Sequence, residues 1–154
     1  MPIRLEKGQR ISLEKNGQQI LRVCVGVNWG TIMKSGLLWG TNEIDVDLDA
    51  SCVLFTGDGE VRDVVFFNNL NSKCGSVFHS GDDLTGDSGG IDDGLDNEVI
   101  TVDFNRIPKD VEHVVFVLNS FQQQDFTDIP YAHIRLYEGT PERVDEVYAK
   151  MDCE

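Results

Sequence analysis

The segment Glu43–Phe55, EIDVDLDASCVLF, alternates acidic or polar residues with apolar ones. This period of two is typical of a β-strand, in which successive side chains point to opposite faces. One face would carry Asp45, Asp47, Asp49 and Ser51, and the other would carry Val46, Leu48 and Ala50. Same-face neighbours in a strand lie about 6.5 to 7 Å apart. The segment therefore predicts a strand with one core face and one acidic face that meets water or a metal ion.

The same segment does not follow the helical calcium-binding loop known as the EF-hand. Counted from Asp45, the sixth position is Ala50, where that loop needs glycine, and the twelfth is Thr56, where it needs glutamate. A calcium site in this chain would therefore have to be built from strands and irregular loops.

Further apolar runs of strand type recur at short intervals along the chain. They are Ile20–Trp29 after Ile11–Leu13 and a turn at Asn16-Gly17, Val61–Phe67 after a hairpin turn at Gly57–Gly59, Val99–Phe104, Val111–Leu118 and Ile134–Tyr137. The nearly continuous apolar run Val111–Leu118 predicts a central strand, and the aperiodic Thr31–Asn42 predicts a loop. The tail from Thr140 fits both a helix and a strand. With about seven strands and little helix, we expect one all-β domain, an antiparallel β-sandwich spanning residues 1–154.

The second acidic stretch is His79–Glu98, HSGDDLTGDSGGIDDGLDNE, a glycine-rich loop. No Lys or Arg occurs between Gly75 and Asn105. Carboxylates brought this close together repel one another unless they take up protons or bind a hard cation. Loops gather at the ends of a sandwich, so we expect Asp45–Asp49 to lie beside this long acidic metal-binding loop.

The overall charge limits the partners of the chain. Its 154 residues carry 27 acids and 13 bases, for a formal net charge of −14, which disfavours nucleic acids and anionic membranes and favours cations and basic surfaces. The four cysteines, Cys24, Cys52, Cys74 and Cys153, form no C-x-x-C pair, and free thiols in a reducing compartment are expected. We find no signal peptide or membrane-length apolar run, and we expect a cytoplasmic protein without membrane insertion.

Several motifs together resemble the TerD family of tellurium-resistance and stress-response proteins. They are Asp47-Leu48-Asp49-Ala50-Ser51, Phe66-Phe67-Asn68-Asn69-Leu70, Gly75-Ser76-Val77, His79-Ser80-Gly81-Asp82-Asp83-Leu84-Thr85-Gly86 and Asp96-Asn97-Glu98-Val99-Ile100. The resemblance implies a non-catalytic, calcium-binding β-sandwich, with other stress-response proteins as candidate partners. It favours a strand over a helix for Glu146–Asp152. It also implies that this chain stops before the family's usual C-terminal closing segments.

The resemblance also implies a set of metal ligands. They are Asp47 and Asp49, Asp82 and Asp83, and Asp96 and Glu98. The chain departs from the family pattern at Asp83, where Asn is usual, and at Asn97, where Asp is frequent. From the residues themselves we add Asp92 and Asp93 as further ligands, and Asn68 as an amide-oxygen donor or a turn residue.

This many carboxylates exceed the six to eight oxygens that one calcium ion takes, so we expect about two Ca²⁺ ions. Magnesium, which wants a rigid octahedron, fits a glycine-rich loop less well. His79, His113 and His133 lack the ligand spacing of a zinc site. The calcium could be a sensor signal, or it could only stabilise the fold of a module whose functional surface lies elsewhere.

One alternative comes from another class of protein. Asp47-Leu48-Asp49-Ala50-Ser51 also resembles the nucleophile motif of haloacid-dehalogenase-type phosphatases, with Gly81–Asp87 as a magnesium motif. Asp47 would then attack phosphorus in a magnesium-dependent phosphotransferase, and Asp49 would act as acid and base. That chemistry requires helices packed around a parallel sheet, so the fold discriminates between the two hypotheses.

Overall fold

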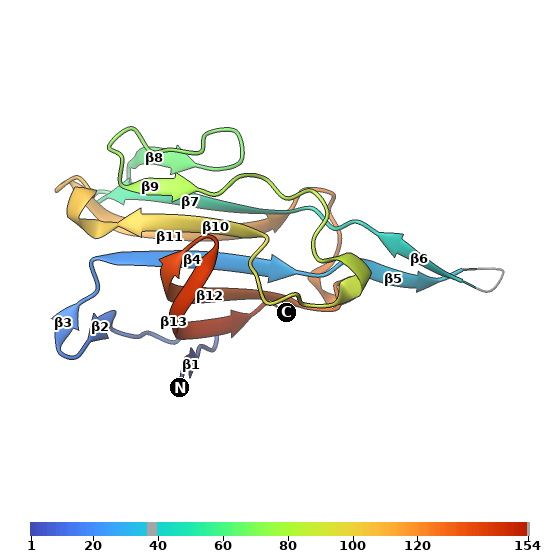
Figure 1. Ribbon diagram of the computed structural model, residues 1–154. Coiled ribbons are helices and arrows are strands. Elements are labelled where there is room, and N and C mark those ends of the chain that lie inside the picture. Colours follow the sequence, from blue (N-terminus) through green and yellow to red (C-terminus); the bar gives the residue numbers. More distant parts are fainter. Residues whose placement is uncertain (37–39, 154) are drawn as a thin grey trace.

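The computed structural model describes residues 1–36 and 40–153, and in them it contains strands, three short 3-10 turns and no α-helix (Figure 1). The strands are β1 (Ile3–Arg4), β2 (Glu14–Lys15), β3 (Gln18–Gln19), β4 (Arg22–Trp29), β5 (Ile32–Ser35), β6 (Thr41–Ile44), β7 (Leu48–Thr56), β8 (Val61–Val65), β9 (Val77–His79), β10 (Glu98–Asp103), β11 (Val111–Ser120), β12 (Ala132–Thr140) and β13 (Arg143–Asp152). The 3-10 turns are η1 (Ser88–Gly90), η2 (Phe104–Arg106) and η3 (Phe126–Asp128).

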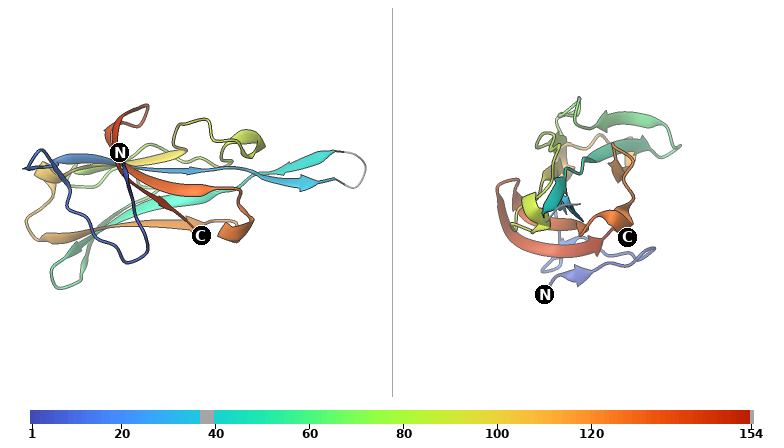
Figure 2. Two further views of the ribbon diagram at one scale, coloured as in Figure 1. Left: turned by 90° about the horizontal axis from the view of Figure 1, so that it is seen from below. Right: turned by 90° about the vertical axis from the view of Figure 1, so that its right-hand side faces the viewer.

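Two sheets form the body of the molecule. The larger has the order β1-β13-β12-β4-β10-β9 and the smaller has the order β11-β7-β8. All strand pairs are antiparallel except β1 with β13. The hairpins β2-β3 and β5-β6 are separate, and β5-β6 extends away from the body (Figures 1 and 2). The expected all-β sandwich is confirmed.

The main core lies between these two sheets. Alternate residues of β4 enter it, from Val23 to Trp29, and alternate residues of β7 enter it from the other side, from Leu48 to Leu54. Because the strand period is two, Val46, Leu48 and Ala50 are buried as the alternation predicts. A residue such as Asp49 is thereby directed to the opposite face of β7, outside the apolar core.

A second, small cluster of buried residues lies on the other face of the larger sheet. It consists of Cys24, Val99 and Tyr137, with Val144 and Val147 packed against it. The β12-β13 hairpin curls over this face (Figure 1), so the tail is a strand, as the resemblance implies. This hairpin also places Arg135 beside Gly26 of β4, which matters for the acidic loop.

The segment Thr31–Asn42 was predicted as a loop, and that prediction is wrong for its described part. Ile32 pairs with Ile44 and Ser35 pairs with Thr41 in the β5-β6 hairpin; residues 37–39 lie outside the described residues. Each arm is only four residues long, which is too short to show a period in the sequence. Cross-strand pairing, together with the burial of Ile32, outweighs the weak local pattern.

The segment Glu43–Phe55 is also not one continuous strand. It is interrupted at Asp45–Asp47, between β6 and β7. The backbone of Val46 bonds elsewhere: its N–H donates to the Thr85 carbonyl at 3.1 Å, and its carbonyl accepts from Trp29 Nε1 at 2.7 Å. At Val46 the acidic loop thus accepts a backbone hydrogen bond that a neighbouring strand would otherwise accept. Likewise Ile11–Leu13 is not a strand, and the hairpin forms at β2-β3 around Asn16-Gly17.

The run Val111–Leu118 belongs to β11, which is an edge strand and not the predicted central one. It pairs only with β7 among the described strands. Its side chains alternate between half-buried and exposed, with Val115 and Val117 at 39% and 42% exposure. Apolar content alone indicates burial on both faces, but here the outer face of a three-stranded sheet remains open.

The fold does not support the phosphotransferase alternative. That reaction was expected to need helices packed around a parallel sheet. The described residues form no α-helix, and their sheets are antiparallel apart from the β1-β13 pair. Among the described residues no helix is long and apolar enough to cross a membrane.

Candidate metal centre

The acidic loop between β9 and β10 is held against the ends of β4 and β7 by backbone hydrogen bonds. The Asp87 N–H donates to the Trp29 carbonyl at 2.9 Å, and the Thr31 N–H donates to the Asp87 carbonyl at 3.0 Å. Together with the bond from Val46 to Thr85, these contacts give the loop a fixed path over the molecule. Its carboxylates are therefore positioned by β4 and by the segment that precedes β7.

One glycine of the loop is required by packing. Gly86 has φ +79°, and a Cβ at this position would lie 2.5 Å from Cδ1 of Trp29. Trp29 is fully buried, so its ring cannot move aside. A larger residue at position 86 would be strained by its backbone conformation and would also clash with the core.

The inner cluster consists of Asp47, Asp49 and Asp82. One carboxylate oxygen from each lies within 4.8 Å of the others. Asp49 projects from the outer face of β7, Asp47 precedes that strand, and Asp82 comes from the acidic loop. Asp47 and Asp49 are buried, whereas Asp82 is exposed. The two acidic stretches thus meet at one place, as their separate patterns predicted.

The inner cluster carries uncompensated negative charge. Burial, together with the neighbouring Asp47, Glu98 and Asp82, raises the pKa of Asp49 to about 6. The pKa values of Asp47 and Asp82 are also raised, in both cases chiefly by burial and then by the surrounding carboxylates. Like charges at this separation disfavour ionisation, so each side chain takes up a proton or a cation more readily than an isolated carboxyl.

We expect Asp49 to make the stability of the metal-free protein depend on pH. Its pKa is about 6 in the fold and 3.8 ordinarily, so the unfolded chain loses this proton first as the pH rises. Stability therefore falls between about pH 4 and pH 6, by up to about 3 kcal/mol for this group. Urea unfolding in EDTA at about pH 4.5 and about pH 7, on either side of the folded-state pKa of about 6, measures most of this fall.

The control for this pH dependence is Asp49→Asn, which cannot ionise. Its stability should fall less than that of the parent chain over the same pH interval. An identical loss of stability in the two proteins would contradict the assignment of the shifted group to Asp49.

Glu98, the first residue of β10, is fully buried and lies next to the inner cluster. Its Oε2 accepts from the Ala50 N–H at 2.8 Å and its Oε1 from the Asp83 N–H at 3.2 Å. The Nε2 atom of His79 lies 3.4 Å from Oε2. Because His79 Nδ1 accepts from the Gly81 N–H, Nε2 carries the ring proton and points to the Ala50 carbonyl. Glu98 therefore joins β7, β9 and the acidic loop.

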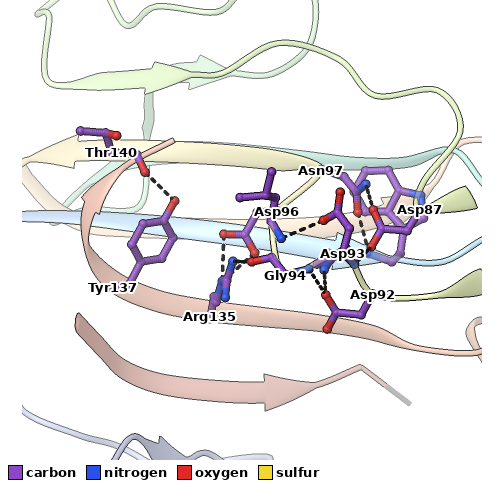
Figure 3. Close-up of polar contacts among 12 residues, drawn as sticks. Asp87, Asp92, Asp93, Gly94, Asp96, Asn97, Arg135, Tyr137 and Thr140 are labelled. Carbon is purple, nitrogen blue, oxygen red and sulfur yellow. Dashed lines mark hydrogen bonds and ion pairs between the residues drawn. The ribbon is translucent and has the colours of Figure 1, made fainter. Parts of the chain in front are cut away.

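The loop cluster consists of Asp87, Asp92 and Asp93, again with one oxygen from each within 4.8 Å of the others (Figure 3). Asp87 is buried, and its Oδ2 accepts from the Tyr131 hydroxyl at 2.6 Å while its Oδ1 accepts from Asn97 Nδ2 at 3.0 Å. Asp92 and Asp93 are exposed. A hollow of about 320 Å³ adjoins the cluster and is lined in part by Asp87, Asp93 and Asn97.

Each cluster is accompanied by a buried oxygen without a hydrogen-bond partner among the described residues. In the inner cluster this is Oδ1 of Asp47. Beside the loop cluster it is Oδ1 of Asn28, whose Nδ2 donates to Asp92 at 2.9 Å. The two side chains are 5% and 1% exposed. Buried polar atoms are rarely left unpaired in native proteins, so a water molecule or an ion is the expected partner of these two oxygens.

Asp83 and Asp96 are predicted ligands that the structure engages in other contacts. Asp83 Oδ1 accepts from the backbone of Thr85 and Gly86. Burial alone would raise the pKa of Asp83, but these hydrogen bonds outweigh it and lower the pKa. Asp96 is paired with Arg135, whose Nε lies 2.8 Å from Oδ1. Neither residue belongs to the two clusters, and their role as ligands stays a prediction.

Arg135 is a counter-ion of the acidic loop that the sequence analysis did not foresee, and it pairs with Asp96. It comes from β12, beyond the segment that lacks basic residues, and its Nη2 also donates to the Gly94 carbonyl at 3.0 Å (Figure 3). The carboxylate of Asp96 sits over Gly26, where a Cβ would lie 2.0 Å from Oδ2. Burial raises the pKa of Asp96, and Arg135 opposes this shift.

Asn68 lies in the exposed turn that follows β8. Among the described residues it makes no side-chain hydrogen bond to either cluster. Its neighbour Asn69 forms the turn, because the Asn69 N–H and carbonyl both pair with Phe66 and its side chain donates to Val64. The turn role considered for this pair is therefore the one that the structure shows.

Several residues that shape the site were missed in the sequence. Glu43 accepts from Thr31, Ser88 and the Gly89 N–H and thereby holds η1 in place. These bonds lower the pKa of Glu43. Asn28, Tyr131 and Arg135 also reach the acidic loop from other strands or turns. Nothing in their local sequence marks them, because their role depends only on tertiary contacts.

Comparison with known proteins places the chain among its relatives. The sequence pattern of the TerD domain matches residues 1–148. The tellurium resistance protein TerZ of Serratia marcescens is 40% identical over 141 residues, covering 90% of this chain and 70% of that protein. The stress response protein SCP2 of Bacillus subtilis (strain 168) is 38% identical over 147 residues, covering 88% and 71%.

Two solved structures share the fold. The crystal structure of the protein SAV2460, of unknown function, has a TM-score of 0.61 at 24% identity and covers 85% of this chain and 70% of its own. A homologue of the telluride resistance protein TerD, SCO6318 from Streptomyces coelicolor A3(2), has a TM-score of 0.58 at 21% identity and covers 78% and 67%. With the family pattern spanning nearly the whole chain and relatives at this level of identity, the chain belongs to the TerD family.

Proposed function

We propose that this protein is a non-catalytic, calcium-binding module of the stress response and of tellurium resistance. It would bind two Ca²⁺ ions, one in the inner cluster and one in the loop cluster. One observation carries the proposal: each group of three carboxylates adjoins a buried oxygen that has no hydrogen-bond partner within residues 1–36 and 40–153. A cation at each position would satisfy that oxygen and the surrounding charge together.

The inner cluster fits a hard cation in its donor set and its electrostatics. It offers carboxylate oxygens only, which is the ligand type that calcium prefers. Asp47, Asp49 and Asp82 have raised pKa values because of burial and mutual repulsion. A divalent ion would relieve this repulsion, and the remaining coordination positions would be filled by water or by nearby carbonyl groups.

The loop cluster also suits a hard cation, because its oxygen ligands are held in place and leave room for water. Asp87 is held by Tyr131 and Asn97, so its carboxylate is oriented before any ion arrives. Asn28 adds an amide oxygen to the acidic oxygens of Asp92 and Asp93. The hollow beside the cluster leaves room for water molecules on the ion. Six to eight oxygens can therefore be assembled without a change in the strands.

Calcium is favoured over zinc and magnesium. Neither cluster contains a histidine or a cysteine, which zinc prefers as ligands. Magnesium requires a small rigid octahedron, whereas these ligands come from an exposed loop and from strand ends. Two divalent ions would change the formal net charge from −14 to about −10 by simple addition.

The biological setting follows from the relatives and is part of the proposal. Several proteins similar in sequence are named for tellurium resistance or stress response. We place this protein in the same processes, with other stress-response proteins as partners. The cysteines Cys24, Cys52, Cys74 and Cys153 are free thiols, which supports a reducing, cytoplasmic location.

Isothermal titration calorimetry of the EDTA-treated protein with CaCl₂ tests the proposal. We expect two binding events. Asp49→Asn should remove the event at the inner cluster, and Asp93→Asn should remove the event at the loop cluster, because each change deletes one anionic ligand. Each variant should keep the event that belongs to the other cluster.

The matched control is Glu142→Gln, which makes the same change of charge at an exposed turn between β12 and β13. Its titration should equal that of the parent chain. Absence of any heat at millimolar calcium would refute the proposal, and a single event that survives both cluster substitutions would refute the assignment of the ions.

A further inference from the structure

The turn η1 in the acidic loop is capped by side chains from outside that loop. Asp87 occupies the N-cap position of η1, but its side chain makes no capping hydrogen bond to the turn. An aspartate at this position ordinarily accepts from the second or third N–H of the helix, which here belong to Gly89 and Gly90. These two N–H groups therefore need other acceptors.

Glu43 and Thr31 supply the two acceptors. Glu43 Oε1 accepts from the Gly89 N–H at 2.6 Å, and Thr31 Oγ1 accepts from the Gly90 N–H at 2.9 Å. The Gly90 N–H lies farther from the Asp87 carbonyl oxygen, at 3.2 Å. Both N–H groups that the side chain of Asp87 would ordinarily take are thus already bonded to residues of another segment.

The two capping side chains also bond to each other. The hydroxyl of Thr31 has a single proton and lies 2.9 Å from Glu43 Oε1 and 3.1 Å from the Asp87 carbonyl. That carbonyl already accepts from the Thr31 N–H, and a bond to a carboxylate is the stronger one, so the proton goes to Glu43. The Gly89 N–H and then the Thr31 hydroxyl lower the pKa of Glu43, which therefore caps η1 as a carboxylate.

Because η1 is capped from outside, the carboxylate of Asp87 faces the loop cluster. Its Oδ2 accepts from the Tyr131 hydroxyl and its Oδ1 accepts from Asn97 Nδ2 (Figure 3). One of its oxygens lies within 4.8 Å of carboxylate oxygens of Asp92 and Asp93. Without the outside caps, this carboxylate would be drawn to the free N–H groups of η1, and the cluster would lose its one buried acid.

The loop cluster has a feature of a cation site beyond its acidic content. Asn28 is 1% exposed, and its Oδ1 has no hydrogen-bond partner within residues 1–36 and 40–153. Its Nδ2 donates to Asp92 at 2.9 Å, which holds this oxygen against the cluster. The orientation of Asp87 therefore decides whether its carboxylate and the amide oxygen of Asn28 can serve the same ion.

Both capping residues belong to the base of the β5-β6 hairpin. Thr31 directly precedes β5, and Glu43 lies on β6 opposite Met33 of β5. The turn η1, drawn in yellow-green, lies against the start of the hairpin (Figure 1). A two-stranded hairpin with arms of four residues is marginally stable by itself, so the contacts at its base contribute to its stability.

We propose that Glu43 and Thr31 are positioning residues of the loop cluster. By capping η1 in place of Asp87 they leave its carboxylate free for the ion, and they connect that ion to the β5-β6 hairpin without coordinating it themselves. This inference rests on the calcium site proposed above for the loop cluster. Because coupling between two sites is reciprocal, calcium in the loop cluster also stabilises the hairpin.

Calorimetry in the Asp49→Asn background, where only the loop event remains, tests the capping role. Glu43→Ala removes the acceptor and should weaken this event about 10- to 100-fold, the usual cost of losing a residue that orients a metal ligand. Glu43→Gln removes the same charge but keeps Oε1, so it should bind at least about tenfold more tightly than Glu43→Ala. Thr31→Val should also weaken the event, whereas Thr31→Ser, which keeps the hydroxyl, should not.

Two controls show that the effect is local. In the Asp93→Asn background only the inner event remains, and Glu43→Ala should leave its affinity unchanged. Glu142→Ala makes the same substitution in the exposed turn between β12 and β13, and it should leave both events unchanged. Far-ultraviolet circular dichroism confirms that each variant is folded.

Amide hydrogen exchange measures the connection to the hairpin. Saturating calcium should slow exchange within Ile32–Ser35 and Thr41–Ile44, in the parent chain and in Asp49→Asn, because the ion makes local opening of the hairpin less favourable. The slowing should be absent in Asp93→Asn, which lacks the loop event. It should also be absent in Glu43→Ala at saturating calcium, because the connecting bonds are gone.

The results that would overturn the inference differ from those that would refute the calcium sites. Glu43→Ala could bind calcium as tightly as the parent chain, or Glu43→Gln could bind as weakly as Glu43→Ala, which would show that Glu43 acts by charge or as a ligand. Hairpin exchange that ignores calcium while calorimetry shows the loop event would disprove the connection. Each of these results leaves the proposed function standing, whereas a parent chain that gives no heat refutes both.

Discussion

Replacing Arg135 with Met is expected to lower the free energy of unfolding by about 3 to 5 kcal/mol, the cost of leaving one member of a buried ion pair without its partner. The side chains of Arg135 and Asp96 are 10% and 1% exposed, and Nε lies 2.8 Å from Oδ1. Methionine keeps most of the apolar stem but removes the charge and the bond to Gly94. Urea unfolding measured with EDTA present gives the change.

Two further variants test the cause of this loss. Arg143→Met breaks the exposed pair with Asp145, whose side chains are 71% and 43% exposed, and it should cost less than about 1 kcal/mol. Adding Asp96→Asn to Arg135→Met should recover part of the stability, because the buried negative charge is gone. If Arg135→Met costs no more than Arg143→Met, Arg135 is not the internal counter-ion of the loop.

Saturating calcium is expected to raise the free energy of unfolding by about 5 kcal/mol. A ligand that binds only the folded state contributes about 2.7 kcal/mol per site when its free concentration is 100 times the dissociation constant. Two sites therefore add about twice this amount. The unfolded chain binds little calcium, because Asp47 and Asp82 are distant in sequence and meet only in the fold. Urea titrations in EDTA and in excess calcium measure the difference.

The cluster variants divide this effect between the two ions. Asp49→Asn and Asp93→Asn should each retain about half of the stabilisation, about 2.7 kcal/mol at 100 times the remaining site's dissociation constant. Equal midpoints in EDTA and in calcium for the parent chain would contradict the proposed function. If calcium stabilises the fold but leaves binding to stress-response proteins unchanged, the ions are structural; if binding requires calcium, they act as a signal.

These tests distinguish the contribution of bound calcium ions to stability from the contribution of Arg135, the basic residue that pairs with Asp96 inside the fold. Arg135 neutralises Asp96 permanently from within the fold, whereas Asp47, Asp49 and Asp82 have no basic residue among their hydrogen-bond and ion-pair partners in the described residues. Loss of Arg135 should therefore lower stability with and without calcium. Loss of Asp49 should remove about half of the calcium-dependent stabilisation, and in EDTA it should also remove the fall in stability with rising pH that this carboxyl causes.

Much of the fold was predictable from local pattern. The alternation in Ile20–Trp29 and in Glu43–Phe55 indicated strands, and β4 and β7 occupy most of these two segments. β4 is buried on both faces. The resemblance to the TerD family decided the tail in favour of a strand. The predictions were wrong where hydrogen bonding to a distant segment determines the secondary structure or the place of a strand in its sheet. These places are the short β5-β6 hairpin, the break at Asp45–Asp47, and the position of β11 at an edge.

The candidate metal centre was also predictable from the sequence only in part. The sequence by itself determined the acidic content of two stretches, their glycine-rich connection and, through strand alternation, the face on which Asp49 lies. Only the tertiary structure decided which carboxylates converge, that Arg135 neutralises Asp96, and that Asn28, Glu43 and Tyr131 hold the loop. The physical reason is range: side-chain direction follows from the local backbone period, whereas charge compensation depends on contacts between residues that the chain brings together only by folding.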